Sequence, residues 1–221
     1  MLTDDELERI GAWRQLVRAG GPAAAPARSV ATPASRDTEA ILDWLRRGHA
    51  LFGLPAPEAR VVDLQDLPDH ARRLLAHNQS MTRTLEAEYR RPMALRVLAA
   101  VERDGQVSRH VMLVHPSGAP VVLAAITIAL GVLPDAVRAQ VAEQRVPLGR
   151  VLAGHGVRYT SCPLGYFTLT PDDRIARLLS LDRRDPLHGR VVVLVDERQR
   201  VLAHGFEILL PAVPASQPGP R

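Results

Sequence analysis

The pattern of apolar and polar residues divides the chain into a first part with helical periodicity and a second part dominated by strands. Up to about residue 91, apolar side chains recur every three or four positions, as they do on one face of an α-helix. From residue 93, alternating apolar and polar residues are joined by short turns such as Asp104-Gly105, which is typical of antiparallel hairpins. This order of elements predicts an α+β fold, with a single antiparallel β-sheet and helices packed on it.

The expected elements are bounded by Pro, Gly and Ser residues at the points where the periodicity changes. Helices are predicted at 3–19, 38–48, 68–76, 81–91, 134–144 and 171–181, and from Pro147 to Gly154 or Gly156. Strands are predicted at 93–103, 106–115, 121–130, 157–170, 189–195 and 201–210, the fourth interrupted near Pro163. Residues 49–67 are rich in turn-forming residues and are predicted to be a loop.

Three regions differ in composition. Residues 1–36 combine one amphipathic helix with a linker rich in Ala, Pro and Ser. Residues 37–213 carry the periodic apolar positions and are expected to form one globular domain. Residues 214–221 contain no large apolar side chain and are expected to be a disordered tail.

The composition excludes several kinds of chemistry. The 221-residue chain contains no lysine, so a Schiff-base lysine, a pyridoxal phosphate anchor and a phosphate-loop lysine are excluded. Cys162 is the one cysteine, which excludes an intrachain disulfide and a cysteine-based zinc site. The chain has no histidine pair at metal-binding spacing and no Gly-x-Ser-x-Gly or Gly-x-Gly-x-x-Gly motif. We therefore expect neither a metal nor a cofactor.

Charge and hydropathy favour neither a nucleic-acid nor a membrane partner. The net charge is +4, but the arginines are interleaved with acidic residues, so no nucleic-acid partner is expected. No apolar run reaches the roughly 18–20 residues that span a bilayer, so no membrane association is expected. The acidic amino terminus differs from a secretory signal. We expect a cytoplasmic protein, monomeric, with a small-molecule ligand.

The stretch from His77 to Glu86 is the first candidate site. Ser80 is a favourable N-cap, which places the backbone N–H of Met81 in the first helical turn, where amide donors have no partner within the helix. Such a helix start can bind an anion. The alternative is that Ser80 only caps a helix on the surface.

Arg109 is the second candidate, because it shares a strand face with Val107, Val111 and Leu113. A guanidinium buried on such a face needs an anion, which is supplied by the protein or by a ligand. The alternatives are a solvent-exposed face or an internal carboxylate partner.

Glu207 is the third candidate, on an apolar strand between Gly205 and Leu209. An acid with small neighbours indicates room above it for a ligand, and the site suits a hydrogen-bonding or proton-transfer role. The alternative is a charge on an edge strand that discourages aggregation.

Leu148 and Gly149 follow Pro147 at a second predicted helix start. Their N–H groups lie where a helix amino terminus can face an anion. The alternative is that this helix, like most that begin with proline, binds nothing.

Six motifs in this order resemble the chorismate pyruvate-lyases, in particular the branch of 4-hydroxybenzoate synthases outside the classical ubiquinone pathway. The resemblance covers about residues 60–213 and excludes residues 1–36. The motifs are Ser80-Met81-Thr82-(x)3-Glu86, Arg109, Gly118-x-Pro120, Pro147-Leu148-Gly149-Arg150, Leu187-His188-Gly189-Arg190 and Phe206-Glu207-(x)2-Leu210-Pro211.

The resemblance implies an α+β domain with helical flaps over a buried ligand, and cofactor-free conversion of chorismate to 4-hydroxybenzoate and pyruvate. It implies that Arg109 and the backbone N–H groups of Met81 and Leu148 hold the carboxylate. It also implies that Glu207 stands at the hydroxyl or ether end, so that Arg109 and Glu207 are the expected catalytic side chains.

One position departs from this pattern. The classical enzymes carry Gly-Arg where this chain has Ala124-Ala125. If that arginine holds the second carboxylate of chorismate, another residue such as Arg83 or Arg158 must replace the arginine missing at Ala125. Otherwise this protein binds a different ligand.

Two other functions are compatible with the same residues. The fold implied by the resemblance is similar to the effector-binding domain of some transcription regulators, which bind small molecules such as aryl carboxylates without catalysis. Those domains normally follow a winged-helix domain, for which about 36 residues are too few. The third possibility is a lyase-like enzyme that acts on a related enolpyruvyl or aryl acid.

Overall fold

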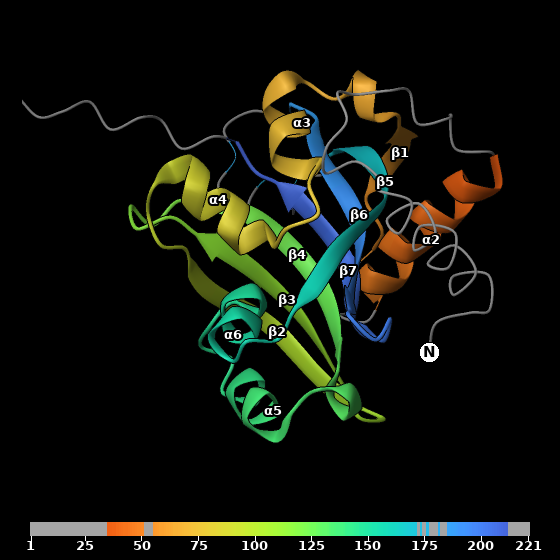
Figure 1. The fold of residues 1–221 in the computed structure, drawn as a ribbon. Helices are drawn as coiled ribbons and strands as arrows, with labels where there is room; N and C mark the ends of the chain where they lie inside the picture. Colours follow the sequence, from red (N-terminus) through yellow and green to blue (C-terminus); the bar gives the residue numbers. More distant parts are fainter. Residues whose placement is uncertain are drawn as a thin grey trace, which may run out of the picture.

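Seven antiparallel strands form one sheet in the order β1-β5-β6-β7-β4-β3-β2, with helices on both faces (Figure 1). The computed structural model describes residues 35–50, 55–171, 173, 176, 181 and 185–211. The strands are β1 (Glu58–Val62), β2 (Ala94–Arg103), β3 (Gln106–Val114), β4 (Pro120–Ala129), β5 (Tyr159–Thr170), β6 (Leu187–Asp196) and β7 (Val201–Leu209). The helices are α2 (Ser35–Ala50), α3 (Asp69–Leu75), α4 (Met81–Tyr89), α5 (Asp135–Ala142) and α6 (Leu148–Gly154), with short 3-10 turns at Leu64–Asp66 and Leu130–Val132.

The single antiparallel sheet with packed helices confirms the predicted fold class. Strands β2, β3 and β4 are consecutive neighbours, as their short connections require. Asp104 and Gly105 both have positive φ, 51° and 71°, which is the backbone of a two-residue hairpin turn between twisted strands. β6 and β7 form a second hairpin. Because β7 pairs with β4, this hairpin and the β2–β4 strands belong to one continuous sheet.

The structure corrects one predicted loop and refines one predicted strand. The segment 49–67 was predicted to be a loop, which is wrong for residues 58–62, because they form the edge strand β1 against β5. β5 runs through Pro163, and the predicted interruption is a register shift between Pro163 and Gly165. The helix expected at 3–19, the tail at 214–221 and most of the helix expected at 171–181 lie outside the described residues.

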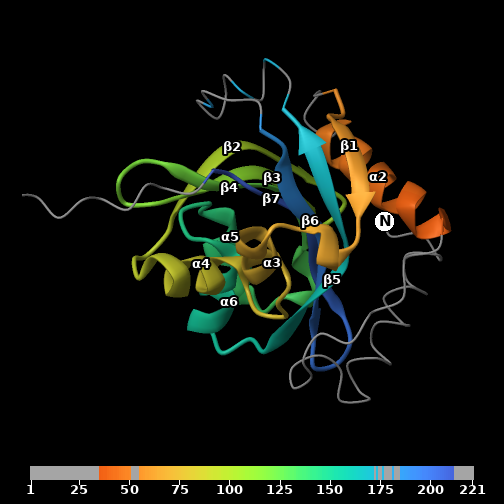
Figure 2. The same cartoon turned by 90° about the horizontal axis from the view of Figure 1, so that it is seen from above.

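The two faces of the sheet have different covers (Figure 2). α2 packs on one face, over an apolar cluster that includes Trp44, Phe167 and Phe206. α3 to α6 lie over the other face and pack on two further clusters, one around Leu85 and the other around Leu152. No helix in the described part of the chain is long and apolar enough to span a membrane.

Candidate functional site

A cavity of about 60 Å³ lies between the sheet and the starts of α4 and α6. Its lining includes the four residues predicted from the sequence: Met81, Arg109, Leu148 and Glu207. They come from α4, β3, α6 and β7, so only the fold brings them together. The rest of the lining is mainly apolar, with Val111, Leu113, Val122, Ile126, Val192 and Leu194 among its residues.

Arg109 is buried in this cavity without a charged partner. Its exposed fraction is 1%, and its Nη1 donates only a long hydrogen bond of 3.5 Å to the Val141 carbonyl oxygen. Its Nε has no hydrogen-bond partner, and no ion pair is found for it among the described residues. Burial lowers the pKa of Arg109 to about 10. Both alternatives, an exposed face and an internal carboxylate, are therefore wrong within the described residues.

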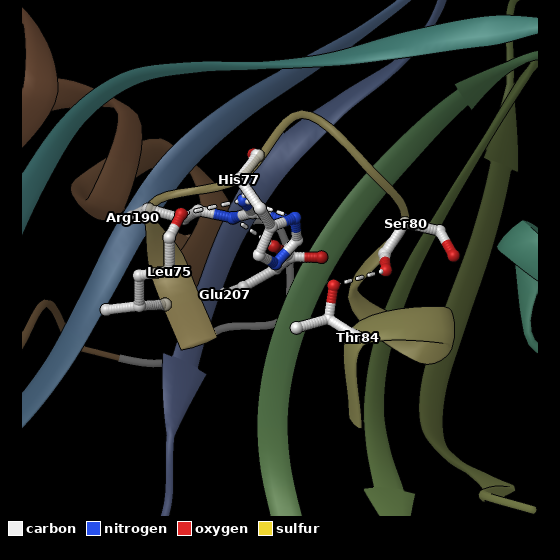
Figure 3. A network of polar contacts seen from close by, with 6 residues as sticks. All are labelled: Leu75, His77, Ser80, Thr84, Arg190 and Glu207. Carbon is white, nitrogen blue, oxygen red and sulfur yellow. Dashed lines mark hydrogen bonds and ion pairs between the residues drawn. The ribbon is translucent and has the colours of Figure 1, made fainter. Parts of the chain in front are cut away.

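Ser80 caps α4, and Ser80, Met81 and Thr82 at the start of this helix line the cavity. Its Oγ accepts a hydrogen bond from the Arg83 N–H at 3.0 Å, and its carbonyl oxygen accepts from the N–H and hydroxyl of Thr84 (Figure 3). The N–H of Met81 belongs to the same first turn and has no acceptor within the helix. Because Met81 is 4% exposed and lines the cavity, this helix start is part of the site.

The start of α6 packs against the start of α4 through Gly149. A Cβ at Gly149 would lie 2.7 Å from the Ser80 Cβ and 3.2 Å from the Tyr159 hydroxyl oxygen, so a larger residue would push the two helix starts apart. The buried side chain of Leu148 lines the cavity next to it. Close packing between the two helix starts therefore requires the glycine of the Pro-Leu-Gly motif, in addition to any role of the motif's N–H groups.

The remaining motif residues on these two helices, Glu86 and Arg150, join α4 to α6. Arg150 of α6 makes an ion pair with Glu86 of α4 and donates to the Met93 carbonyl oxygen at 3.1 Å. Glu86 in turn accepts from the Met93 N–H at 3.0 Å. This arrangement joins α4, α6 and the segment before β2, which keeps both helix starts over the sheet.

Glu207 is held by a second buried arginine. β7 is a central strand, so the edge-strand alternative for Glu207 is wrong. Arg190 is 0% exposed, and its Nε donates to Glu207 Oε2 at 2.6 Å. Its Nη1 also donates to the carbonyl oxygens of Leu75 and His77, at 2.9 and 3.0 Å (Figure 3). The sequence motif contained Arg190, but its role was missed; the available signal was an arginine preceding a run of five apolar residues.

Two ring groups around this network have shifted pKa values. Burial, followed by the nearby Arg190 charge, lowers the pKa of His77 to about 3. Burial raises the pKa of Tyr159, whose hydroxyl lies near Ser80. At neutral pH His77 is therefore an uncharged imidazole and Tyr159 a neutral phenol.

Ala125, the position of the missing arginine, is among the lining residues, but its side chain packs on the other side of the sheet, under α2. The Cβ of Ala125 lies 3.7 Å from where a Cβ on Gly48 of α2 would stand, and its side chain belongs to the cluster under α2. Neither suggested replacement is among the lining residues: Arg83 and Arg158 are exposed, and Arg158 pairs with Glu197 at 3.0 Å. Arg109 is thus the one cation among the lining residues described.

The described residues contain no group of three or more His, Cys, Asp or Glu side chains placed to hold a metal ion. Cys162 is buried in the cluster under α2, on the opposite side of the sheet from the cavity.

No family model and no curated protein matches the sequence. Solved structures with similarity to this chain include a GntR-family transcriptional regulator, the ligand-binding domain of a putative GntR-family regulator from Bordetella bronchiseptica, and PhnF. PhnF from Mycobacterium smegmatis is 17% identical, with 62% of this chain and 69% of that chain covered and a TM-score of 0.45. Its effector domain alone is 17% identical, with coverages of 60% and 89% and a TM-score of 0.43. A GntR-family regulator from Bacillus cereus is 15% identical, with coverages of 54% and 92% and a TM-score of 0.40.

Proposed function

We propose that this protein binds a small aromatic carboxylate in the cavity, with the carboxylate on Arg109. The observation that carries this proposal is a 1% exposed guanidinium with no anionic partner among the described residues. A buried, unpaired charge costs several kcal/mol, and a ligand carboxylate would offset that cost through charge-assisted hydrogen bonds. The apolar lining suits the body of an aromatic ring.

The helix starts would support the same carboxylate. The Met81 N–H in the first turn of α4 is a free donor beside the cavity, and the Leu148 N–H occupies the corresponding place in the shorter α6. A hydrogen bond to a charged group contributes about 1.5–3 kcal/mol, and a helix terminus adds about 0.3–1 kcal/mol. Arg109 would therefore supply the largest single contribution to carboxylate binding.

Glu207 provides a hydrogen-bond acceptor at another part of the cavity. Because Arg190 already pairs with its carboxylate, Glu207 is suited to accept a hydrogen bond from an uncharged hydroxyl of the ligand. A ring with a carboxylate at one end and a hydroxyl at the other, as in 4-hydroxybenzoate, satisfies both ends. We use 4-hydroxybenzoate as the reference ligand for this class.

Titration calorimetry of the purified chain with 4-hydroxybenzoate and 4-hydroxybenzamide tests the proposal. We expect the carboxylate to bind at least tenfold more tightly than the amide, because only the carboxylate pairs with Arg109. Arg109→Met should remove this preference, while Arg138→Met, on an exposed arginine of α5, should keep it. Equal binding of the two ligands by the native chain, or no binding of either, would refute the proposal.

A second candidate function is chorismate lyase activity, which we propose because Glu207 lies in the cavity that Arg109 and the helix starts line. In this reaction the ring C4–H proton is lost, the ether C3–O bond breaks, and the enolate that leaves is protonated to pyruvate. The electrons of the C–H bond complete the aromatic ring, so no oxidant or cofactor is needed. Glu207 would assist departure of the leaving group, and positioning by Arg109 would supply much of the remaining rate enhancement.

Incubation with chorismate separates the two candidates. A lyase releases 4-hydroxybenzoate and pyruvate in equal amounts, faster than chorismate decomposes without protein, and Glu207→Gln lowers kcat more than it raises KM. Folded protein that binds 4-hydroxybenzoate but releases no pyruvate above that rate would leave the binding function and exclude the lyase.

A further inference from the structure

Tyr159 is a cavity-lining side chain to which the proposed function gives no role. It is the first residue of β5 and lines the cavity together with Ser80 and Gly149. The Tyr159 hydroxyl oxygen lies 3.2 Å from the point where a Cβ on Gly149 would stand, and the Ser80 Oγ lies 2.8 Å from the same point. Both hydroxyl groups therefore lie beside Gly149, where the starts of α4 and α6 pack together.

The Tyr159 hydroxyl is hydrogen-bonded to the side chain that caps α4. Burial raises the pKa of Tyr159, and the hydrogen bond with the Ser80 side chain acts in the opposite direction. Ser80 Oγ also accepts from the Arg83 N–H at 3.0 Å. The two bonds are compatible when the Ser80 O–H donates to the phenol oxygen, because the serine oxygen keeps a lone pair for the amide. One serine side chain thus joins β5 to the first turn of α4.

A second hydrogen bond from β5 holds the same segment. The N–H of Ser161, two residues after Tyr159, donates to the Asn78 carbonyl oxygen at 3.0 Å. Tyr159 and Ser161 therefore fix two points of the segment that leads into α4, the second of them Ser80. The Met81 amide follows immediately after this segment. Its position consequently depends on β5 as well as on the helix itself.

The direction of the Met81 N–H matters for binding an anion. A hydrogen bond weakens steeply when its angle falls below about 120°, so a small rotation of the helix start would lose the contact. The cap bond fixes Ser80 relative to α4 alone. Tyr159 fixes Ser80 relative to the sheet, and the same sheet carries Arg109 on β3. The phenol therefore relates the amide on α4 to the guanidinium on β3.

We propose that Tyr159 is a positioning residue, whose hydroxyl fixes Ser80 so that the Met81 N–H and Arg109 can bind one ligand carboxylate. In this role the phenol acts through Ser80 and not on the ligand directly. The inference rests on the proposed function, because it takes the carboxylate to be on Arg109. Part of the affinity for an anionic ligand then depends on a side chain that does not touch the anion.

Tyr159→Phe removes the hydroxyl and keeps the ring. We expect this variant to bind 4-hydroxybenzoate about three- to tenfold more weakly than the native chain in titration calorimetry, which corresponds to one hydrogen bond. Tyr166→Phe is the matched control, because Tyr166 is on the same strand, packs on the cluster around Leu85 and is absent from the cavity lining. The control should bind 4-hydroxybenzoate as the native chain does.

A double-mutant cycle with Met81→Pro separates positioning from other roles of the hydroxyl. Proline at this position removes the N–H, so Tyr159→Phe should cause no further loss of affinity in that background. A hydroxyl that contacts the ligand itself, or that only supports the shape of the cavity, would weaken binding by the same factor in both backgrounds. Circular dichroism checks that all variants fold.

Hydrogen exchange of the Arg83 amide tests the structural step without a ligand. This N–H is bonded to Ser80 Oγ, so it should exchange faster in Tyr159→Phe than in Tyr166→Phe if the phenol fixes Ser80. Equal exchange rates in the two variants would overturn the inference whether or not a ligand binds.

The binding outcomes distinguish this inference from the proposed function. A loss of affinity in Tyr159→Phe that occurs only when the Met81 amide is present supports the positioning role. Unchanged affinity in Tyr159→Phe, or the same loss in both backgrounds, overturns the positioning role while the proposed function stands. If the native chain binds no aryl carboxylate, the proposed function fails and the positioning role fails with it.

Discussion

Arg190 and Glu207 form a buried ion pair, with Arg190 Nε 2.6 Å from Glu207 Oε2, and the same guanidinium binds the carbonyl oxygens of Leu75 and His77. One side chain thus holds the acid on β7 and the segment that leads into α4. Arg109, equally buried, has no such partner in the described residues. The two arginines are therefore expected to respond in opposite ways to substitution.

Replacing each arginine by methionine should separate structure from binding. Arg109→Met removes an unpaired buried charge, so the free energy of unfolding should stay the same or rise by about 1–3 kcal/mol. Arg190→Met leaves Glu207 and two carbonyl oxygens without a partner, so it should destabilise the protein by about 3–5 kcal/mol. Urea unfolding of the two variants measures both values. A large loss of stability in Arg109→Met would indicate an internal partner for that arginine.

Substitutions at Met81 should distinguish its amide from its side chain. Proline is tolerated at the first position of a helix, and Ser80 has φ −69° and ψ 142°, which is compatible with a following proline. Met81→Pro should therefore keep α4 but remove the N–H, and it should weaken 4-hydroxybenzoate binding about tenfold.

Met81→Leu and Met81→Ala are the controls for the lost side chain, and we expect them to bind within about threefold of the native chain. Calorimetry gives the affinities and circular dichroism the helix content. If proline and alanine weaken binding equally, the amide does not contact the ligand.

The ion pair between Glu86 and Arg150 should contribute modestly to stability. Both side chains are partly exposed, at 29% and 42%, so solvent screens the pair. A double-mutant cycle with Glu86→Gln and Arg150→Gln should give a coupling of about 0.5–1 kcal/mol that shrinks at 1 M salt. A coupling that does not depend on salt would mean that packing around Met93, rather than charge, joins α4 to α6.

His77 should make the protein sensitive to acid. Its pKa is about 3 in the folded chain, below the unfolded value of 6.5, so the unfolded state binds more protons between these values. Stability is therefore expected to fall as the pH drops from 6.5 towards 3, by about 2–3 kcal/mol between pH 7 and pH 4.5.

Unfolding free energies measured over this pH range in native protein and in His77→Gln test the assignment. His77→Gln should flatten the dependence, whereas the control His155→Gln, on an exposed histidine that contacts Gln140, should not. A native slope that persists in His77→Gln would assign the acid sensitivity to other groups.

Local sequence was enough to locate most elements of the fold. The alternation in 106–115 and the Asp104-Gly105 turn predict the β2–β3 hairpin, because strand periodicity and positive φ are local properties of the chain. The edge strand β1 was missed because its five residues lie among prolines and pair with β5, about a hundred residues away. Such a partner leaves no local pattern in the sequence.

The sequence by itself determined the α+β class, the four candidate residues Met81, Arg109, Leu148 and Glu207, and the absence of lysine chemistry, since these depend on residue type and near neighbours. Only the tertiary structure decided that Arg109 has no counter-ion among the described residues, that Arg190 holds Glu207, and that the side chain at position 125 packs under α2. Counter-ions and cavity faces depend on contacts between strands distant in sequence, and those contacts form only when the sheet is assembled.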